Sequence, residues 1–361
     1  MHYFKHSKLF LWTIWLLALV LIIYFSTQIS FVFQPIIVLF STLFIPILSA
    51  GFLFYLLNPI ISVMQKLKIQ RSYAIILVMV FFLGVSTIFA IKTFPLLMDQ
   101  LSDLVANIPT ILSDIDIQTK DFALFPAFDN INLEETLKQL NISLDTFAKT
   151  ILSSFTTSIS SIIAGVANLT IVLFTVPIIL FYMFHDGEKL QLSITHLFPD
   201  KYKKHIFELL HQTNEVITAY ISGKGLASIV VAVLIYFGLL MIGLPYTLLL
   251  AIVNGFTNLI PYIGPFIGAV PAVIVGLTIS PTAALLVILV ILIVQQLDAN
   301  LLTPKFVGKS LAIHPLTIII ILLVAGKMLG IVGIIFGVPA FAVFKTIVVY
   351  IRNTRLSVEK L

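Results

Sequence analysis

The chain has 361 residues, of which 60% are hydrophobic and only 10% are charged, and its formal net charge is +5. Because soluble domains carry about 25% charged residues, this composition excludes a soluble globular protein and predicts an integral membrane protein. The chain contains no cysteine, which excludes a disulfide framework, a thiolate metal site and a cysteine nucleophile. The modest basic excess is typical of the positive charge that membrane proteins keep on their cytoplasmic side, and it requires no nucleic-acid partner.

Apolar runs long enough to cross the roughly 30 Å hydrocarbon core of a bilayer recur along the chain. We therefore predict an all-α polytopic membrane protein with about eight membrane segments. The first run, residues 9–25, exceeds the usual core of a signal peptide and no small-residue cleavage site follows it, so it is predicted to be the first span. The predicted segments are 9–25, 35–57, 73–91, 155–184, 226–242 and 282–297, with two interrupted apolar segments at 246–279 and 313–350.

The distribution of lysine and arginine predicts the orientation of these segments. Basic residues precede the first span, follow the second, are frequent in 185–224, and return near Lys305 and at the C-terminus. The positive-inside rule places these regions and both termini in the cytoplasm. Lysine is sparse in 93–150, which is therefore predicted to lie outside. The segments 246–279 and 313–350 then enter the membrane from opposite faces, an inverted relation in which their tips can meet near the midplane.

This orientation divides the chain into five parts. The predicted parts are 1–92, the first three spans; 93–150, an extracytoplasmic amphipathic helical segment; 151–184, the fourth span; 185–224, cytoplasmic interfacial helices; and 225–361, a transport core. In the outer segment, Leu97, Leu101 and Leu104 begin an apolar pattern with helical spacing, and Asn132 followed by Glu135 resembles a capping box. We favour helices that pack on the outer face over an enzymatic domain.

The segments 246–279 and 313–350 repeat one pattern, and we name them the first and the second hairpin. Each reads Pro-x-Thr, an apolar run, then Gly-x-x-x-Gly followed by Pro-Ala. Interrupted apolar segments at corresponding places in two halves predict re-entrant hairpins at a substrate path. The alternative is an ordinary tight turn between two spans. The candidate residues are Pro261, Gly264, Gly268 and Pro271 in the first hairpin and Gly330, Gly333, Gly337 and Pro339 in the second.

Polar residues in and beside the first hairpin are the other candidates for the solute or ion path. Asn254 and Asn258 lie one turn apart in an apolar run, where the alternative role is hydrogen bonding between helices. Asp298 closes the span 282–297 and either binds a proton or cation or marks the membrane interface. Its neighbours Gln295, Asn300 and Pro304 complete the candidate set. Without any HExxH, GxSxG or Walker-type motif, we expect no catalytic site, no metal and no cofactor.

Several motifs occur in a fixed order. They are Phe-Tyr-Met-Phe-His-Asp-Gly-Glu (181–188), Leu-Phe-Pro (197–199), Tyr-Ile-Ser-Gly-Lys (220–224), Asn-Leu-Ile-Pro-Tyr-Ile-Gly-Pro (258–265), Gln-Gln-Leu-Asp-Ala-Asn (295–300) and Gly-Ile-Val-Gly-Ile-Ile-Phe-Gly-Val-Pro (330–339). In these motifs the chain resembles the AI-2E family of transporters. Many relatives carry Gly-Gln where this chain has Gly223 and Lys224, so a role for that amide is not carried over. The acid at position 298 also varies within the family.

The resemblance implies a homo-oligomeric protein of the bacterial cytoplasmic (inner) membrane. Members are described as exporters of the quorum-sensing furanone autoinducer-2, and others as sodium/proton antiporters. Our expectation is a secondary transporter, in contact with membrane lipid, that exports a small polar solute by alternating access without ATP. The alternatives are a cation/proton antiporter of the same fold and a non-transporting assembly or developmental protein that depends on 93–150. A membrane-embedded enzyme is least favoured.

The orientation can be tested directly because the chain has no cysteine of its own. Cysteines introduced at Ser102 and Asn130 should react with an impermeant thiol reagent from outside, whereas cysteines at Ser62 and Ser193 should not. Labelling in the reverse pattern would overturn the orientation and with it the opposite entry of the two hairpins.

Overall fold

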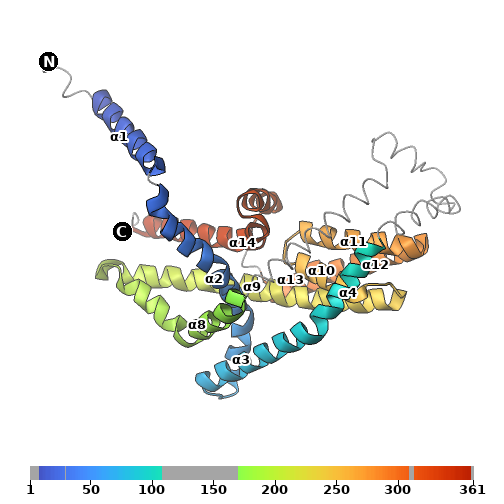
Figure 1. Cartoon of the computed structure of the whole chain (residues 1–361). Coiled ribbons are helices and arrows are strands. Elements are labelled where there is room, and N and C mark those ends of the chain that lie inside the picture. The colour runs from blue at the N-terminus through green and yellow to red at the C-terminus, as the bar shows by residue number, and fades with distance from the viewer. Residues whose placement is uncertain (1–7, 29, 108–169, 309–312, 359–361) are drawn as a thin grey trace.

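The computed structural model describes residues 8–28, 30–107, 170–308 and 313–358, which form helices joined by short turns (Figure 1). Within these ranges there is no β-strand. Five described helices are long and apolar enough to cross a membrane, namely Val38–Lys66, Arg71–Leu104, Asp200–Ile242, Pro281–Phe306 and Pro315–Thr354. Shorter apolar helices are Leu11–Ile22, Thr247–Thr257 and Ile263–Ile279. The all-α membrane class is confirmed, whereas about eight segments stays a prediction.

The second and third helices of the chain pack with α8 into one bundle. Helix α1 (Lys8–Gln28) extends away from the rest of the structure in Figure 1. Helix α2 (Ser30–Lys66) packs against α3 (Arg71–Ile88) and α8 (Thr170–His196). The buried residues of this bundle are Ala50, Ile61, Ala74, Ile75, Val78, Met79, Val176, Leu180 and Phe184. Residues 155–169 of the predicted fourth span lie outside the described residues.

Helix α3 continues through a π-helical turn, η2 (Phe89–Thr93), into α4 (Phe94–Ala106). The predicted boundary between residues 92 and 93 therefore lies inside a continuous helical rod. Leu97, Leu101 and Leu104 are all buried against the core formed by the later helices, which confirms the apolar face predicted from their spacing. The rest of that segment, including the helix predicted from Asn132, lies outside the described residues.

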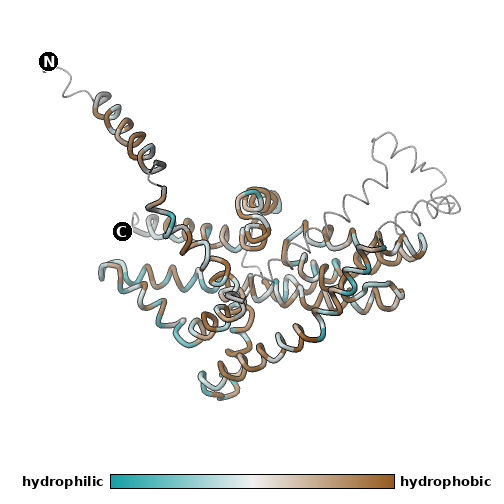
Figure 2. Tube along the Cα trace, in the orientation of Figure 1, coloured by the Kyte–Doolittle hydropathy of each residue, from teal (hydrophilic) through white to brown (hydrophobic). Residues whose placement is uncertain are grey.

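Helix α9 (Asp200–Ile242) has 43 residues and is about 65 Å long at 1.5 Å per residue. Hydrophilic residues gather where α8 and α9 join (Figure 2). The helix runs without interruption through the predicted boundary between residues 224 and 225. That boundary was placed where charge gives way to an apolar run, but Lys224 is only 8% exposed and lies inside the helix packing.

The first hairpin forms as an interrupted pair of helices. Helix α10 (Thr247–Thr257) ends at a turn over residues 258–262, and α11 (Ile263–Ile279) returns beside it. The would-be Cβ of Gly264 overlaps the carbonyl oxygen of Thr257, and that of Gly268 lies 2.6 Å from the Thr257 hydroxyl. Glycine is therefore required at both positions for α11 to lie this close to α10. Pro271 is buried within α11 without breaking it.

After the first hairpin, Ser280 caps helix α12 (Pro281–Leu297) by accepting a hydrogen bond from the backbone N–H of Ala283 at 3.0 Å. Helix α12 leads into a second π-helical turn, η4 (Asp298–Leu302), and a short helix, α13 (Thr303–Phe306). The described chain resumes at residue 313.

The second hairpin lies within α14 (Pro315–Val358), which is interrupted at Gly330 with φ 60° and ψ −140°. This conformation suits glycine and lets the chain reverse. The two arms then contact each other closely, because a Cβ on Gly333 would overlap the carbonyl oxygen of Ala325 and one on Gly337 would lie 3.0 Å from the Ala325 methyl group. The predicted break in this segment is therefore present, at the glycines that the sequence singled out.

The two hairpins meet tip to arm rather than tip to tip. Ile260, in the turn of the first hairpin, packs in one cluster with residues from both arms of the second hairpin and with Tyr220 and Ile221 of α9. The arm residues are Ile318, Leu322, Ile334 and Val338. The turn of the second hairpin stays apart from the described part of the first, since no described atom lies within 4 Å of a Cβ built on Gly330 and its neighbours Met328 and Leu329 are exposed. The expected meeting of two tips is corrected accordingly, and the inverted entry from opposite faces stays a prediction.

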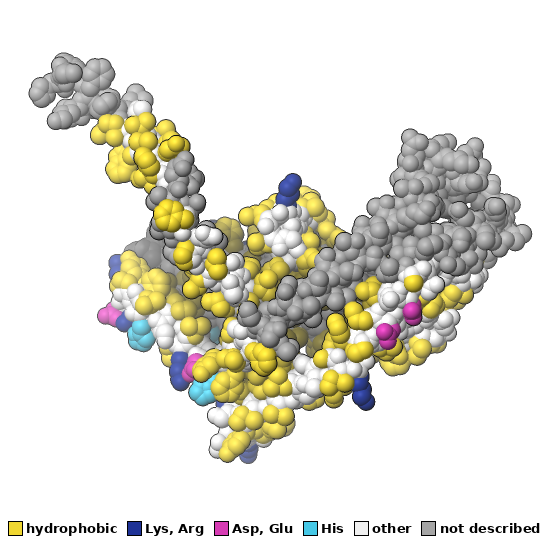
Figure 3. All heavy atoms as spheres, viewed as in Figure 1, with side chains coloured by type: hydrophobic (Ala, Val, Ile, Leu, Met, Phe, Trp, Pro, Cys, Tyr) yellow, Lys and Arg dark blue, Asp and Glu magenta, His cyan; other side chains and the backbone are white. Residues whose placement is uncertain are grey.

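Hydrophobic side chains cover most of the molecular face seen in Figure 3, and the charged side chains on it are few and scattered. Large exposed residues such as Trp12, Phe81, Phe266 and Leu323 suit a surface in contact with lipid. Polar groups that this fold buries are therefore the ones that demand an explanation.

Replacing Gly264 with alanine should destabilise the protein, because the new methyl group would overlap the Thr257 carbonyl at the turn of the first hairpin. Gly84→Ala is the matched control, since a Cβ at this helical glycine meets no atom of the described residues within 4 Å. We expect the thermal midpoint in detergent to fall for Gly264→Ala and to stay level or rise for Gly84→Ala. Equal midpoints for the two variants would contradict the close packing of α10 on α11.

Candidate functional site

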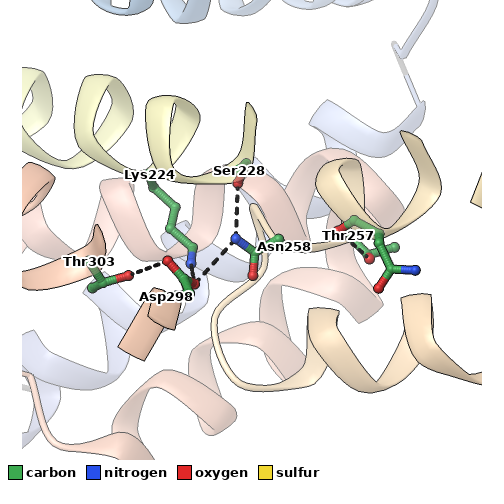
Figure 4. Close-up of polar contacts among 7 residues, drawn as sticks. Lys224, Ser228, Thr257, Asn258, Asp298 and Thr303 are labelled. Carbon is green, nitrogen blue, oxygen red and sulfur yellow. Dashed lines mark hydrogen bonds and ion pairs between the residues drawn. The ribbon is translucent and has the colours of Figure 1, made fainter. Parts of the chain in front are cut away.

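A buried ion pair lies at the centre of the second half of the chain. Lys224 of α9 places its Nζ 3.0 Å from Oδ2 of Asp298, the first residue of η4 (Figure 4). Asp298 is 5% exposed, so both charged groups are removed from solvent. Buried charges are tolerated when they are paired and hydrogen-bonded, and inside membrane helices such residues mark substrate or ion paths by default.

Two further elements contribute donors to the Asp298 carboxylate. Asn258, at the turn of the first hairpin, donates from Nδ2 to Oδ2 at 3.3 Å, and Thr303 of α13 donates from its hydroxyl to Oδ1 at 3.0 Å. The same Asn258 amide contacts the Ser228 hydroxyl of α9 at 3.4 Å. The carboxylate therefore connects α9, the first hairpin and α13 at one point (Figure 4).

Local backbone features bring these groups together. The π-helical turn η4 places residues five apart on one face, which brings Thr303 next to Asp298. Gly223 allows α13 to approach α9, because a Cβ there would overlap the backbone carbonyl of Phe306. The preference of π-helical turns for functional sites agrees with this placement.

Asn254 has a different role from Asn258. Its Nδ2 donates to the carbonyl of Gly268 at 2.8 Å and to that of Leu250 at 3.1 Å, so its side chain fastens the two arms of the first hairpin to each other. The alternative weighed from the sequence, hydrogen bonding between helices, is the one observed for Asn254.

The remaining predicted site residues separate into three groups. Gln295 lies near the ion pair in sequence, and its buried Nε2 has no hydrogen-bond partner in the described part of the chain. Asn300 is exposed, and its Nδ2 donates to Oε1 of Gln296 at 3.0 Å. Residues Pro261, Gly264, Gly268, Pro271, Pro304, Gly330, Gly333 and Gly337 shape turns and helix contacts rather than lining the ion pair.

Pro339 helps to line a small cavity between the two hairpins. The cavity is lined by Phe52, Tyr220, Ile221, Lys224, Leu259, Ile335, Phe336 and Pro339, and the volume open to the centre of a water molecule is about 10 Å³. This is enough for roughly one water molecule. The Tyr220 hydroxyl is buried here and has no hydrogen-bond partner among the described residues. The ion pair thus borders, through Lys224, a small cavity between the tip of the first hairpin and the second arm of the second.

Sequence reasoning missed Lys224, Ser228, Thr303 and Tyr220. Lys224 was assigned to the basic cytoplasmic segment because it precedes a long apolar run. The signal that could have found it is the composition around it, since Gly223, Gly225, Ala227 and Ser228 are small residues typical of closely packed membrane helices. A lysine on such a face needs a buried counter-charge, and Asp298 was already a candidate.

The family model described as "AI-2E family transporter" matches residues 12–353. The chain belongs to this family. It is similar to "Putative transport protein YueF" of Bacillus subtilis, with 40% identity over 341 residues that cover 94% of this chain and 92% of the relative. It is also 31% identical to "Putative transport protein YrrI" of Bacillus subtilis, over 97% of this chain and 98% of the relative. "Putative permease PerM" of Escherichia coli K12 is 30% identical over 87% and 88% of the two chains.

Membership of the AI-2E family supports a role in membrane transport. The structure contains no group of three or more His, Cys, Asp or Glu side chains that could hold a metal ion in the regions it describes. The polar chemistry of the described core is therefore that of one ammonium, one carboxylate, hydroxyls and amides.

A double-mutant cycle should show that Lys224 and Asp298 depend on each other. Lys224→Met or Asp298→Asn alone leaves one buried charge uncompensated, which we expect to cost about 3–5 kcal/mol, whereas the double variant should recover most of that loss. The measurement is the free energy of unfolding in detergent with choline chloride as the only salt. Additive losses in the double variant would contradict the direct pairing.

Proposed function

We propose that this AI-2E family protein is a secondary transporter that exports a small polar solute, such as the furanone autoinducer-2, by alternating access. The observation that carries the proposal is the position of Asn258, which joins the tip of the first hairpin to the buried Lys224–Asp298 pair. Non-helical backbone at membrane depth is tolerated where it is buried in protein or lines a cavity, and this turn borders a cavity between two interrupted hairpins.

The chemistry of the site suits an uncharged molecule with several hydroxyl or carbonyl groups. The Asn258 Nδ2 donates a hydrogen bond to the Ser228 hydroxyl at the long distance of 3.4 Å. A solute hydroxyl can replace this weak contact. Tyr220 adds a buried hydroxyl at the neighbouring cavity, and this hydroxyl has no hydrogen-bond partner among the described residues. Because the cavity is too small for a solute, solute entry requires the tip of the first hairpin to move away from α9.

Packing units that contact one another through α9 provide the moving parts. One is the bundle of α2, α3 and α8, a second is the core that α4, α9, α10, α11 and α12 form, and a third cluster joins both hairpins to α9. We assign the first unit to the scaffold and the hairpins to the mobile part. Phe52 of α2 lines the cavity together with residues of both hairpins, so movement between the units would open it. The protein is proposed to act as a homo-oligomer in the bacterial cytoplasmic membrane, with both termini inside.

A cation/proton antiporter is the second candidate, and the buried Asp298 carboxylate is the observation that favours it. Asp298→Asn keeps the size of the side chain but removes the titratable proton. If the protein is an antiporter, this substitution should abolish sodium/proton exchange in vesicles. In the solute exporter, solute exchange at equal ion concentrations on both sides should persist in the same variant.

Flux in proteoliposomes tests the proposed function. Labelled autoinducer-2 and sodium should be measured side by side, and we expect saturable flux of the solute. Asn258→Ala should raise the apparent KM by roughly 10-fold or more, because it removes a hydrogen-bonding group from the site. Asn300→Ala is the matched control, since it removes the same amide from an exposed position only two residues beyond Asp298. Sodium flux without solute flux, or equal effects of the two substitutions, would contradict the proposal.

A further inference from the structure

Lys224 places a positive charge that is covalently attached to the protein beside the carboxylate of Asp298. Its Nζ lies 3.0 Å from Oδ2, and both side chains are about nine-tenths buried, with 10% and 7% of their surfaces exposed. An isolated carboxylate at this depth would require a cation for neutralisation. In this chain the ammonium supplies it, so the position next to Asp298 that a metal cation would take is already filled.

The ion pair belongs to a chain of linked polar groups that contains oxygen atoms of the kind that hard cations bind. Asp298 Oδ2 contacts the ammonium directly, Asn258 Nδ2 donates to the same oxygen, and the Ser228 hydroxyl contacts that amide. The Asn258 Oδ1 is buried and has no hydrogen-bond partner within the described chain. Because an amide can turn over by 180°, this oxygen can replace Nδ2 toward Asp298 once a cation in place of the ammonium attracts it.

Close contacts surround α9 on either side of Lys224. Gly223 and Gly225 flank the lysine, and each permits another element to lie against the helix. Phe306 of α13 lies against Gly223, and a Cβ built on Gly225 would be 2.6 Å from the Leu56 Cδ1 of α2. Lys224 itself is only 8% exposed, so its charge is kept inside the helix packing.

We propose that Lys224 is a built-in cation that takes the place of a bound alkali-metal ion at Asp298. It holds Asp298 and the tip of the first hairpin together, so that this chain neither binds nor requires sodium at the site. Removal of the ammonium uncovers a site for a monovalent cation, built from Asp298, Asn258 and Ser228. The binding part of this inference stands on the contacts alone, and only its consequence for flux rests on the proposed transport function.

Cation-dependent thermal stability of the purified full-length protein in detergent tests the inference. Wild-type protein should have the same melting midpoint in sodium, potassium, lithium and choline chloride at equal ionic strength. Lys224→Ala should melt lower in choline and recover in a saturable manner with sodium or lithium, by roughly 5 °C at about 100 times the dissociation constant. Adding Asp298→Asn to Lys224→Ala should remove that recovery. Radioactive sodium should bind to Lys224→Ala but not to the wild type or to the double variant.

Lys327→Ala is the matched control, because Lys327 is an exposed lysine on a membrane helix, α14, and its removal creates no buried negative charge. This variant should show no difference between sodium and choline. Lys224→Gln provides a second test variant with a side chain that keeps more of the lysine volume. It should gain sodium binding like Lys224→Ala.

Each other outcome overturns the inference. Binding of sodium to the wild type, or its stabilisation by sodium over choline, would show that Lys224 does not replace the ion. Folded Lys224→Ala and Lys224→Gln that respond to no alkali-metal ion would show that no cation site lies beneath the lysine. If neither variant folds even in sodium, the inference is also overturned, because sodium should restore their folding.

The flux arm separates this inference from the proposed function. Wild-type solute flux that continues unchanged when choline replaces sodium supports both. Solute flux that requires a sodium gradient overturns the built-in cation but keeps the transporter. Absence of solute flux in every salt overturns the proposed function, while the binding results on the purified protein still decide the role of Lys224.

Discussion

Charge neutralisation at one buried point holds the second half of this protein together. The Asp298 carboxylate accepts hydrogen bonds from Lys224, Asn258 and Thr303, which come from three different elements of the chain. In a low-dielectric interior, an unpaired carboxylate would cost several kcal/mol, so each donor fixes the position of the element that carries it. These contacts are directional, whereas apolar packing is non-directional, so they fix the relative register of the turn of the first hairpin, the middle of α9 and the beginning of α13.

Glycine positions make that convergence sterically possible. Gly264 and Gly268 bring the arms of the first hairpin together, and Gly223 brings α13 to α9. In a membrane, packing of backbones at close range provides much of the attraction between helices, because lipid is as apolar as the helices themselves. Replacing glycine with a larger residue on the outer surface would be tolerated, because the added side chain would contact only lipid. Interrupted helices and small residues are thus two parts of one arrangement that admits polar groups to the interior.

Much of the fold could be predicted from the sequence because it depends on local signals. Long apolar runs predict helices that span a membrane, and the Gly-x-x-x-Gly repeats predicted both hairpins close to where α10, α11 and α14 form them. Asn258 and Asp298 were candidates because a polar group in an apolar run needs a partner. The identity of that partner could not be obtained in this way, because the contact between residues 224 and 298 spans 74 positions and depends on tertiary packing. Lys224 was misplaced for the same reason, since charge at the edge of an apolar run is usually solvated.

Helix α9 is more than twice as long as the hydrocarbon core is thick, at about 65 Å against roughly 30 Å. The helix is continuous from its polar first half to the residues that carry Lys224 and Ser228. A single rigid element therefore joins the charged residues near its beginning to the buried ion pair. In the first half of α9, Glu208 accepts a hydrogen bond from Tyr350 of α14. The last part of the second hairpin is therefore joined to the same continuous helix that holds the buried ammonium.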